Sequence, residues 1–179
     1  MPAKSAYSRG GLLSADRGIG TQVAALVGFL GASFATSALG SLVIVSNAPG
    51  WYAAASKAPW TPPGWVFGTI WTALYAAMAV AAWLVWRQRS APIHGAMRAY
   101  AVQMLLNLSW APTFFGMYPM LGVAALWLAL AVIAALAAAV TTTIVRFGPI
   151  STTAGLLMLP YLSWIVFSGS LNLYAAVNN

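Results

Sequence analysis

The sequence predicts an all-α integral membrane protein with five transmembrane helices, and three observations lead to this fold class. First, 61% of the 179 residues are hydrophobic and only 5% are charged, whereas about a quarter of the residues in a soluble domain are charged. Second, the apolar segments are continuous runs without alternation, which favours helices over a transmembrane β-barrel. Third, the gaps between charged residues match the roughly 20 residues that a helix needs to cross a bilayer.

The first two helices are predicted on either side of a loop that carries one lysine. The run 19–45 is long enough to cross the bilayer. It is about twice as long as the apolar core of a secretory signal, so we expect it to be retained as a helix. The loop 46–64, which contains Lys57, has several prolines that bar helix continuation. A second helix is then expected at about 64–86.

The other three helices follow from the spacing of the later arginines. Arg98 and Arg146 enclose 47 uncharged residues, which would form a helix of about 70 Å, too long for one crossing. The sequence Gly-Met-Tyr-Pro at 116–119 is the natural turn within this segment. We therefore expect helices at about 99–115, 120–145 and 150–177. Residues 19–177 then form a single membrane domain behind a polar, basic N-terminal segment, 1–18.

The cationic residues divide unequally between the two sides that this topology defines. Lys57 is the only one expected on one side. The other side is expected to carry Lys4, Arg9, Arg17, Arg87, Arg89, Arg98 and Arg146. Because cytoplasmic loops are enriched in lysine and arginine, the N-terminus is predicted inside and the C-terminus outside, in a bacterial cell (inner) membrane. The net charge of +7 is thereby explained by the loops, and nucleic-acid binding is not expected.

Most catalytic chemistry is excluded by composition. Asp16 is the sole acidic residue and there is no cysteine. A carboxylate metal site, a pair of acid/base carboxylates, a thiolate nucleophile and an intramembrane acid that could couple a proton to pumping are therefore absent from the chain. The lone His94 lies in a charged loop and is expected to be solvated. No metal and no required cofactor are predicted.

The loop after the first helix carries the densest cluster of candidate residues. Trp51, Trp60 and Trp65 stand in a segment stiffened by prolines. They are either part of an aromatic belt at the lipid headgroups or a lid over a cavity between helices. Lys57 either extends to the membrane surface or pairs with an acidic group of an amphipathic ligand.

Three of the expected helices carry aromatic and polar residues at helical spacing. The stripes are Trp71, Tyr75 and Met78 on the second helix; Gln103, Asn107, Trp110 and Phe114 on the third; and Tyr161, Trp164, Ser168 and Asn172 on the fifth. Residues at this spacing share one face of a helix. Hydrogen bonding and packing between helices would explain each stripe alone. Three such stripes together favour a shared inward cavity.

These residues resemble the TspO/MBR family, the tryptophan-rich sensory proteins and mitochondrial translocator proteins (peripheral benzodiazepine receptors). The matching segments are Trp51-Tyr52, Lys57, Trp60-x-Pro62-Pro63-x-Trp65-Val66-Phe67, Trp71-x-x-Leu74-Tyr75-x-x-Met78, Asn107-x-x-Trp110-x-x-x-Phe114-Phe115-Gly116, Pro160-Tyr161-Leu162-x-Trp164 and Leu171-Asn172. They extend over roughly residues 20–175 in three separated parts of the chain.

The resemblance implies a five-helix bundle whose ligand cavity is capped by the first loop. It also implies tetrapyrroles such as protoporphyrin IX and haem as ligands, sterols in some members, and homodimers. The chain would then be a receptor, transporter or sensor for porphyrins and similar amphipathic planar molecules. The alternatives are an enzyme that degrades protoporphyrin IX in light and oxygen through Trp110 and Trp164, and a purely structural or regulatory membrane partner.

Overall fold

The computed structural model describes residues 18–88 and 91–179, and these residues form helices and no strand. The helices are α1 (Ile19–Asn47), α2 (Gly64–Trp86), α3 (His94–Ala111), α4 (Tyr118–Leu121), α5 (Val123–Phe147), α6 (Thr152–Leu157) and α7 (Leu159–Asn178), with π-helical turns η1 (Ala48–Tyr52) and η2 (Pro112–Gly116). Nearly all of the predicted N-terminal segment 1–18, with Lys4, Arg9, Asp16 and Arg17, lies outside the described residues, as does Arg89.

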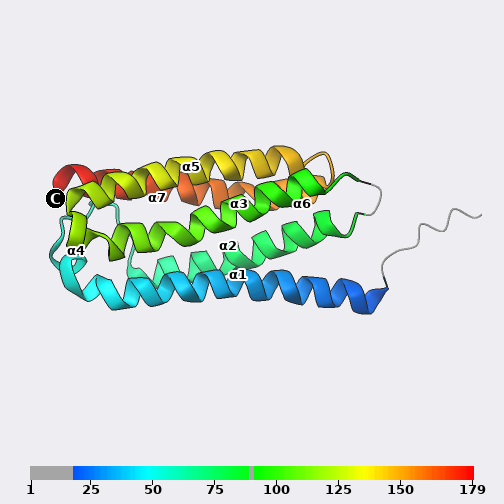
Figure 1. Cartoon of the computed structure of the whole chain (residues 1–179), viewed down its shortest axis with the longest axis horizontal. Coiled ribbons are helices and arrows are strands. Elements are labelled where there is room, and N and C mark those ends of the chain that lie inside the picture. Colours follow the sequence, from blue (N-terminus) through cyan, green and yellow to red (C-terminus); the bar gives the residue numbers. More distant parts are fainter. Residues whose placement is uncertain (1–17, 89–90) are drawn as a thin grey trace, which may run out of the picture.

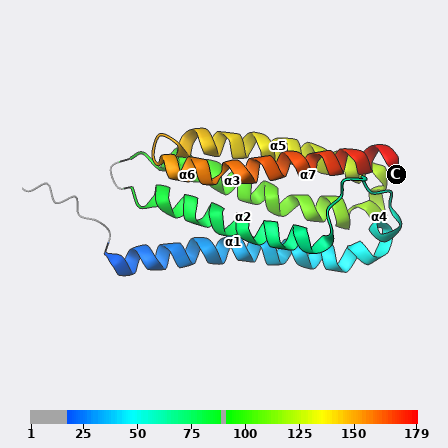
Figure 2. The same cartoon turned by 180° about the vertical axis from the view of Figure 1, so that it is seen from behind.

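The long helices lie side by side along one axis (Figure 1). α3 packs on α5, α5 packs on α7, and α1 packs on α2, whereas α2 touches α3 and α7 only lightly. Seen from behind, α1 and α2 form one side of the bundle and α5 and α7 the other (Figure 2). The α1–α2 pair thus stands apart from α7 over part of its length.

Among the described residues, four helical segments are long and apolar enough to cross a membrane, where the sequence predicted five. They are Ile19–Tyr52, Gly64–Trp86, Val123–Phe147 and Thr152–Asn178. The segment missing from this set is α3, whose 18 residues include Arg98 and the amides Gln103 and Asn107. α3 also starts at His94 rather than near residue 99, because nothing between these positions breaks the helix.

The reversal of the chain before α5 includes the predicted turn at 116–119 and extends beyond it. The chain leaves η2 at Gly116 and crosses the end of the bundle in the short helix α4 (Figure 1). The reversal is completed at Gly122, which has φ 56° and ψ −138° and separates α4 from α5. Residues with a side chain rarely adopt this backbone conformation, so glycine decides where the turn falls.

Two prolines inside the predicted helices, Pro112 and Pro160, have different effects. At Pro112 the helix widens into the π-helical turn η2, in which the Met117 amide donates to the Pro112 carbonyl at 3.0 Å. The predicted helix 150–177 is instead broken into α6 and α7 around Met158. Pro160 has no N–H for the Leu156 carbonyl, and the Met158 amide donates to Gly155 at 3.2 Å to close a tighter turn.

The tightest core lies where α2, α5 and α6 meet. Met78, Val85, Val140, Phe147 and Met158 have no exposed surface. α6 packs on both α2 and α5 here, and the close packing of their side chains favours dispersion contacts. The space among these three helices is therefore filled by side chains.

Candidate ligand cavity

A cavity of about 610 Å³ opens among α1, α2, α3, α5 and α7 near the C-terminal end of the bundle. This volume falls within the range of about 300–1,000 Å³ of small-molecule sites. Its aromatic wall is made by Tyr52, Phe67, Trp71, Tyr75, Trp110, Phe114 and Phe115. The wall therefore offers several ring faces to a planar ligand.

The loop between α1 and α2 contributes one side of the cavity through Lys57, Ala58, Thr61 and Pro62. The Lys57 ammonium donates to the Ala53 carbonyl at 3.2 Å and lies 4.9 Å from the centroid of the Tyr52 ring. Within residues 18–88 and 91–179 there is no acidic side chain to balance it. The cavity thus has a cation at its edge that contacts a carbonyl and an aromatic face but has no carboxylate side chain beside it among the described residues.

The polar residues deep in the cavity are bonded to one another. The Tyr75 hydroxyl donates to the Asn107 carbonyl oxygen, and the Asn107 amide donates to the Tyr161 hydroxyl at 2.8 Å. The Trp110 indole N–H donates to Asn172 at 3.1 Å. The Asn172 amide in turn donates to the Leu126 carbonyl at 2.9 Å. Because these groups already have partners, a ligand can pack against them without leaving a buried polar group unpaired.

Eight of the predicted site residues line the cavity: Lys57, Trp71, Tyr75, Asn107, Trp110, Phe114, Ser168 and Asn172. Ser168 is the one whose hydroxyl is buried without a hydrogen-bond partner. The other six predicted residues, Trp51, Trp60, Trp65, Gln103, Tyr161 and Trp164, do not line it. That the lining residues bind a ligand stays a prediction.

Trp51 and Trp60 fasten the first loop to the bundle. The Trp51 indole N–H donates to the Phe115 carbonyl at 3.2 Å, and its ring stacks on Tyr118 with centroids 3.6 Å apart. The Trp60 indole N–H donates to Ser170 at 3.2 Å, and its ring meets Tyr174 edge-on. These two tryptophans hold the lid in place from outside the cavity.

Tyr161 is bonded to the lining residue Asn107. The other three predicted residues, Trp65, Trp164 and Gln103, lie in different surroundings. Trp65 is 74% exposed on the outside of α2. Trp164 packs against Phe67 and Phe167, and its buried indole N–H has no partner. Gln103 is fully buried against the Met78 sulfur. The stripes on α3 and α7 are thus wider than the cavity, and their outer members pack between helices.

The sequence reasoning missed the part of the wall that α1 provides. Thr36, Ser37, Gly40, Ser41 and Ile44 line the cavity from this helix. The first four are small or polar residues repeating at helical spacing, and this pattern was a signal for a helix face turned to a cavity. Small residues are common throughout this chain, so the pattern did not stand out.

The comparisons with known proteins agree with this architecture. The family model described as the TspO/MBR family matches residues 24–177. The chain belongs to the TspO/MBR family. The motif resemblance is thereby confirmed, and an integral membrane protein follows from TspO/MBR membership together with the four apolar helices.

Curated relatives match over most of their own length. The "Tryptophan-rich sensory protein" of Cereibacter sphaeroides is 37% identical over 150 residues, covering 82% of this chain and 86% of the relative. The "Tryptophan-rich protein TspO" of Archaeoglobus fulgidus is 35% identical over 151 residues, covering 84% and 91%. The "Translocator protein" of Homo sapiens is 34% identical over 137 residues, covering 75% and 78%. TspO/MBR relatives thus occur in bacteria, archaea and animals.

Proposed function

We propose that this chain is a membrane receptor, transporter or sensor that binds tetrapyrroles, such as protoporphyrin IX and haem, and similar amphipathic planar molecules in the aromatic cavity. The observation that carries this proposal is the combination of a ring-lined cavity with a single cation at its edge. A flat macrocycle can stack on Trp71 or Trp110, while a carboxylate on its rim meets Lys57. TspO/MBR membership supports the receptor or sensor role.

Saturable quenching of tryptophan fluorescence by protoporphyrin IX in the purified full chain tests this function. Lys57→Ala should weaken binding by about 1.4- to five-fold at low salt, because an exposed ion pair contributes about 0.2–1 kcal/mol. Salt should reduce wild-type affinity more than that of the variant. Arg87→Ala, at the other end of the bundle, is the control for net charge and should bind like wild type.

Absence of saturable quenching by any tetrapyrrole would instead favour a structural or regulatory role in the membrane. Equal affinity and equal salt dependence for Lys57→Ala and wild type would remove the ion pair from the proposal while leaving the stacking part intact.

Light- and oxygen-dependent degradation of protoporphyrin IX is the second candidate function. The position of Trp110 in the cavity lining supports it. Trp110 faces the cavity, whereas Trp164 packs between α2 and α7. If the activity exists, Trp110→Phe should slow the loss of the porphyrin Soret band under illumination and Trp164→Phe should not. Wild-type decay rates for both variants would argue against catalysis by these tryptophans.

We further propose that α3 crosses the bilayer as the fifth span of the bundle. Its amides Gln103 and Asn107 are buried and face other helices, so they do not meet lipid. The arginines Arg87, Arg98 and Arg146 lie at one end of the bundle and Lys57 at the other, which supports an inner-membrane orientation with the N-terminus inside. Homodimerisation stays a prediction.

A further inference from the structure

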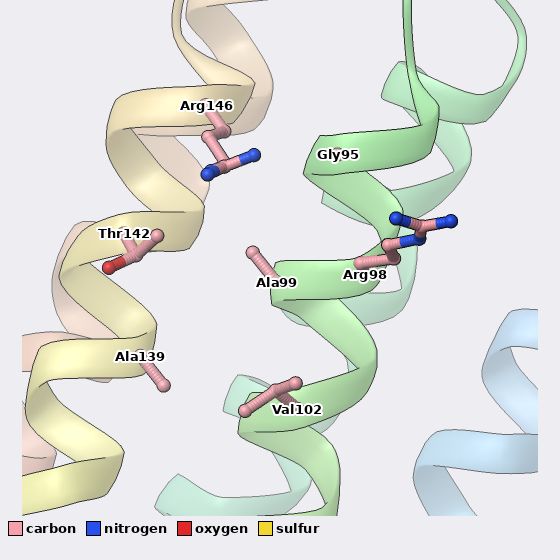
Figure 3. Close-up of a pocket in the computed structure, with 7 residues that line it drawn as sticks. All are labelled: Gly95, Arg98, Ala99, Val102, Ala139, Thr142 and Arg146. Atoms are coloured by element: carbon pink, nitrogen blue, oxygen red, sulfur yellow. The ribbon is translucent and has the colours of Figure 1, made fainter.

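A second concave site lies between α3 and α5, at the end of the bundle opposite the C-terminus (Figures 1 and 3). Its volume is about 380 Å³. The residues that line it are Gly95, Arg98, Ala99, Val102, Ala139, Thr142 and Arg146. None of them lines the aromatic cavity, so this groove is a separate site.

Arg146 reaches from the last turn of α5 toward the first turn of α3 (Figure 3). A methyl group added to Gly95 would lie 2.6 Å from a terminal nitrogen of the Arg146 guanidinium. The guanidinium therefore occupies the space that a side chain at position 95 would take. Gly95 thus lets Arg146 lie directly against α3.

Among the described residues, this arrangement concentrates positive charge without an acidic side chain beside it. Arg98 adds a second guanidinium to the same turn of α3, extending away from α5 and exposed (Figure 3). No side chain caps the start of α3, whose free amide groups carry partial positive charge. Asp16 is the one acidic side chain of the sequence and lies outside the described residues, and the C-terminus is at the far end of the bundle.

Other arginines at this end are placed differently. The Arg87 guanidinium lies 4.9 Å from the Trp83 ring centroid, so an aromatic face offsets its charge. Arg146 has a glycine beside it instead. Thr142 does not supply a donor to the groove, because its hydroxyl donates to the Ala138 carbonyl at 2.8 Å. The Arg146 guanidinium is therefore the side-chain donor that an anion in the groove would meet, and its fork suits a phosphate. Arg98 adds positive charge from the far side of α3.

Below the arginines the groove becomes apolar. Ala99 and Ala139 leave its floor shallow, and Val102 is 50% exposed beside them. A hydrocarbon chain fits this surface, whereas free phosphate would use only the upper part. A second copy of the same face would bring arginines against arginines, which disfavours a symmetric contact here.

We propose that this groove binds an anionic phospholipid, with the phosphate held by Arg146, the positive charge of Arg98 nearby, and an acyl chain along Val102. Basic pockets between transmembrane helices on the cytoplasmic side have this use in other membrane proteins. The bound lipid supplies a negative charge that no side chain of residues 18–88 and 91–179 supplies at the start of α3.

Native mass spectrometry of the full chain, released from nanodiscs of equal phosphatidylglycerol and phosphatidylcholine content with identical acyl chains, tests the site. Wild type should retain one phosphatidylglycerol in preference to phosphatidylcholine. Arg146→Gln should lower this preference about five-fold, since the attraction of one cation for anionic lipid is about 1 kcal/mol. Arg98→Gln should lower it less, because Arg98 extends away from the groove. Circular dichroism and gel filtration check that each variant is folded.

Two control variants distinguish a defined lipid-binding site from general electrostatic attraction between the basic end of the bundle and anionic lipids. Gly95→Ala keeps the net charge and has the better helix propensity, yet it should lower the preference because it displaces the guanidinium. Arg87→Gln removes one charge at the same end of the bundle and should leave the preference unchanged.

Unchanged retention in Arg146→Gln and Gly95→Ala would overturn the proposal, and so would an equal loss in Arg87→Gln. Inorganic phosphate at millimolar concentration should not displace the lipid. Full displacement by phosphate would assign the groove to a free anion instead.

Discussion

At the scale of single residues, the amide side chains of this bundle fix the shape of the cavity wall. Asn107 joins tyrosines on two other helices, and Asn172 joins the Trp110 indole to a backbone carbonyl of α5. Each bond between membrane helices contributes about 0.6 kcal/mol on average. Their larger effect is on orientation, because Trp110 is held with its ring on Phe114.

Gly122 sets the turn before α5, and replacing it should be costly. Gly122→Ala forces a side chain into φ 56° and ψ −138°, which we expect to destabilise the fold by about 1–3 kcal/mol. No atom lies within 4 Å of the added methyl, so backbone strain alone is tested. The midpoint of thermal unfolding in detergent measures the effect.

Gly116→Ala is the matched control for this glycine. Gly116 lies in the neighbouring turn η2, its φ is not positive, and its added methyl would make an ordinary contact with Val43 at 3.9 Å. Equal stability of the Gly122→Ala variant and wild type would show that the turn relaxes without strain.

At the scale of elements, the first loop is a lid fastened at several points. Trp51 ties η1 to η2, and Trp60 ties the loop to α7. The Ser56 amide donates to the Asn179 side chain at 2.8 Å, and the same side chain donates back to the Ser56 carbonyl at 3.1 Å. Trp65 has no such role, because its ring is exposed on the outside of α2. Its place in an aromatic belt at the lipid headgroups stays a prediction.

Trp60→Phe removes one of these fastenings while keeping the ring against Tyr174. Loss of a hydrogen bond of about 0.5–1.5 kcal/mol should raise the rate of porphyrin dissociation roughly two- to twelve-fold. Stopped-flow fluorescence measures this rate. Trp65→Phe, a change at an exposed ring, should dissociate like wild type; a similar acceleration in both variants would argue against a specific lid contact.

The helix boundaries show which structural features the sequence pattern can predict and which it cannot. The bounds 64–86 of α2 agree with prediction because the apolar run ends at prolines and at Arg87. At Pro112 and Pro160 the sequence indicates weakened helices but not the outcome. Whether a proline yields a wider turn or a break depends on which neighbouring amides find partners, and the packing around each helix decides that.

At the scale of the whole molecule, charge is separated along the bundle axis. We expect this separation to orient the chain with its N-terminus in the cytoplasm. The chain has no cysteine, so single-cysteine variants give a clean measurement. Ala54→Cys should react with a membrane-impermeant maleimide on intact cells, and Pro149→Cys should react only after permeabilisation. The reverse pattern would invert the topology.

The sequence by itself determined the class of this protein, the place of its long helices and its family. Those features depend on runs of apolar residues and on local motifs, which are properties of neighbouring positions along the chain. Only the tertiary structure decided which tryptophans reach the cavity. Trp110 and Trp164 occupy similar stripes, but a stripe is wider than the contact it makes, and the rotation of α3 and α7 against their neighbours selects Trp110. The contribution of α1 to the wall, and the approach of Arg146 to Gly95, arise from contacts between distant segments in the same way.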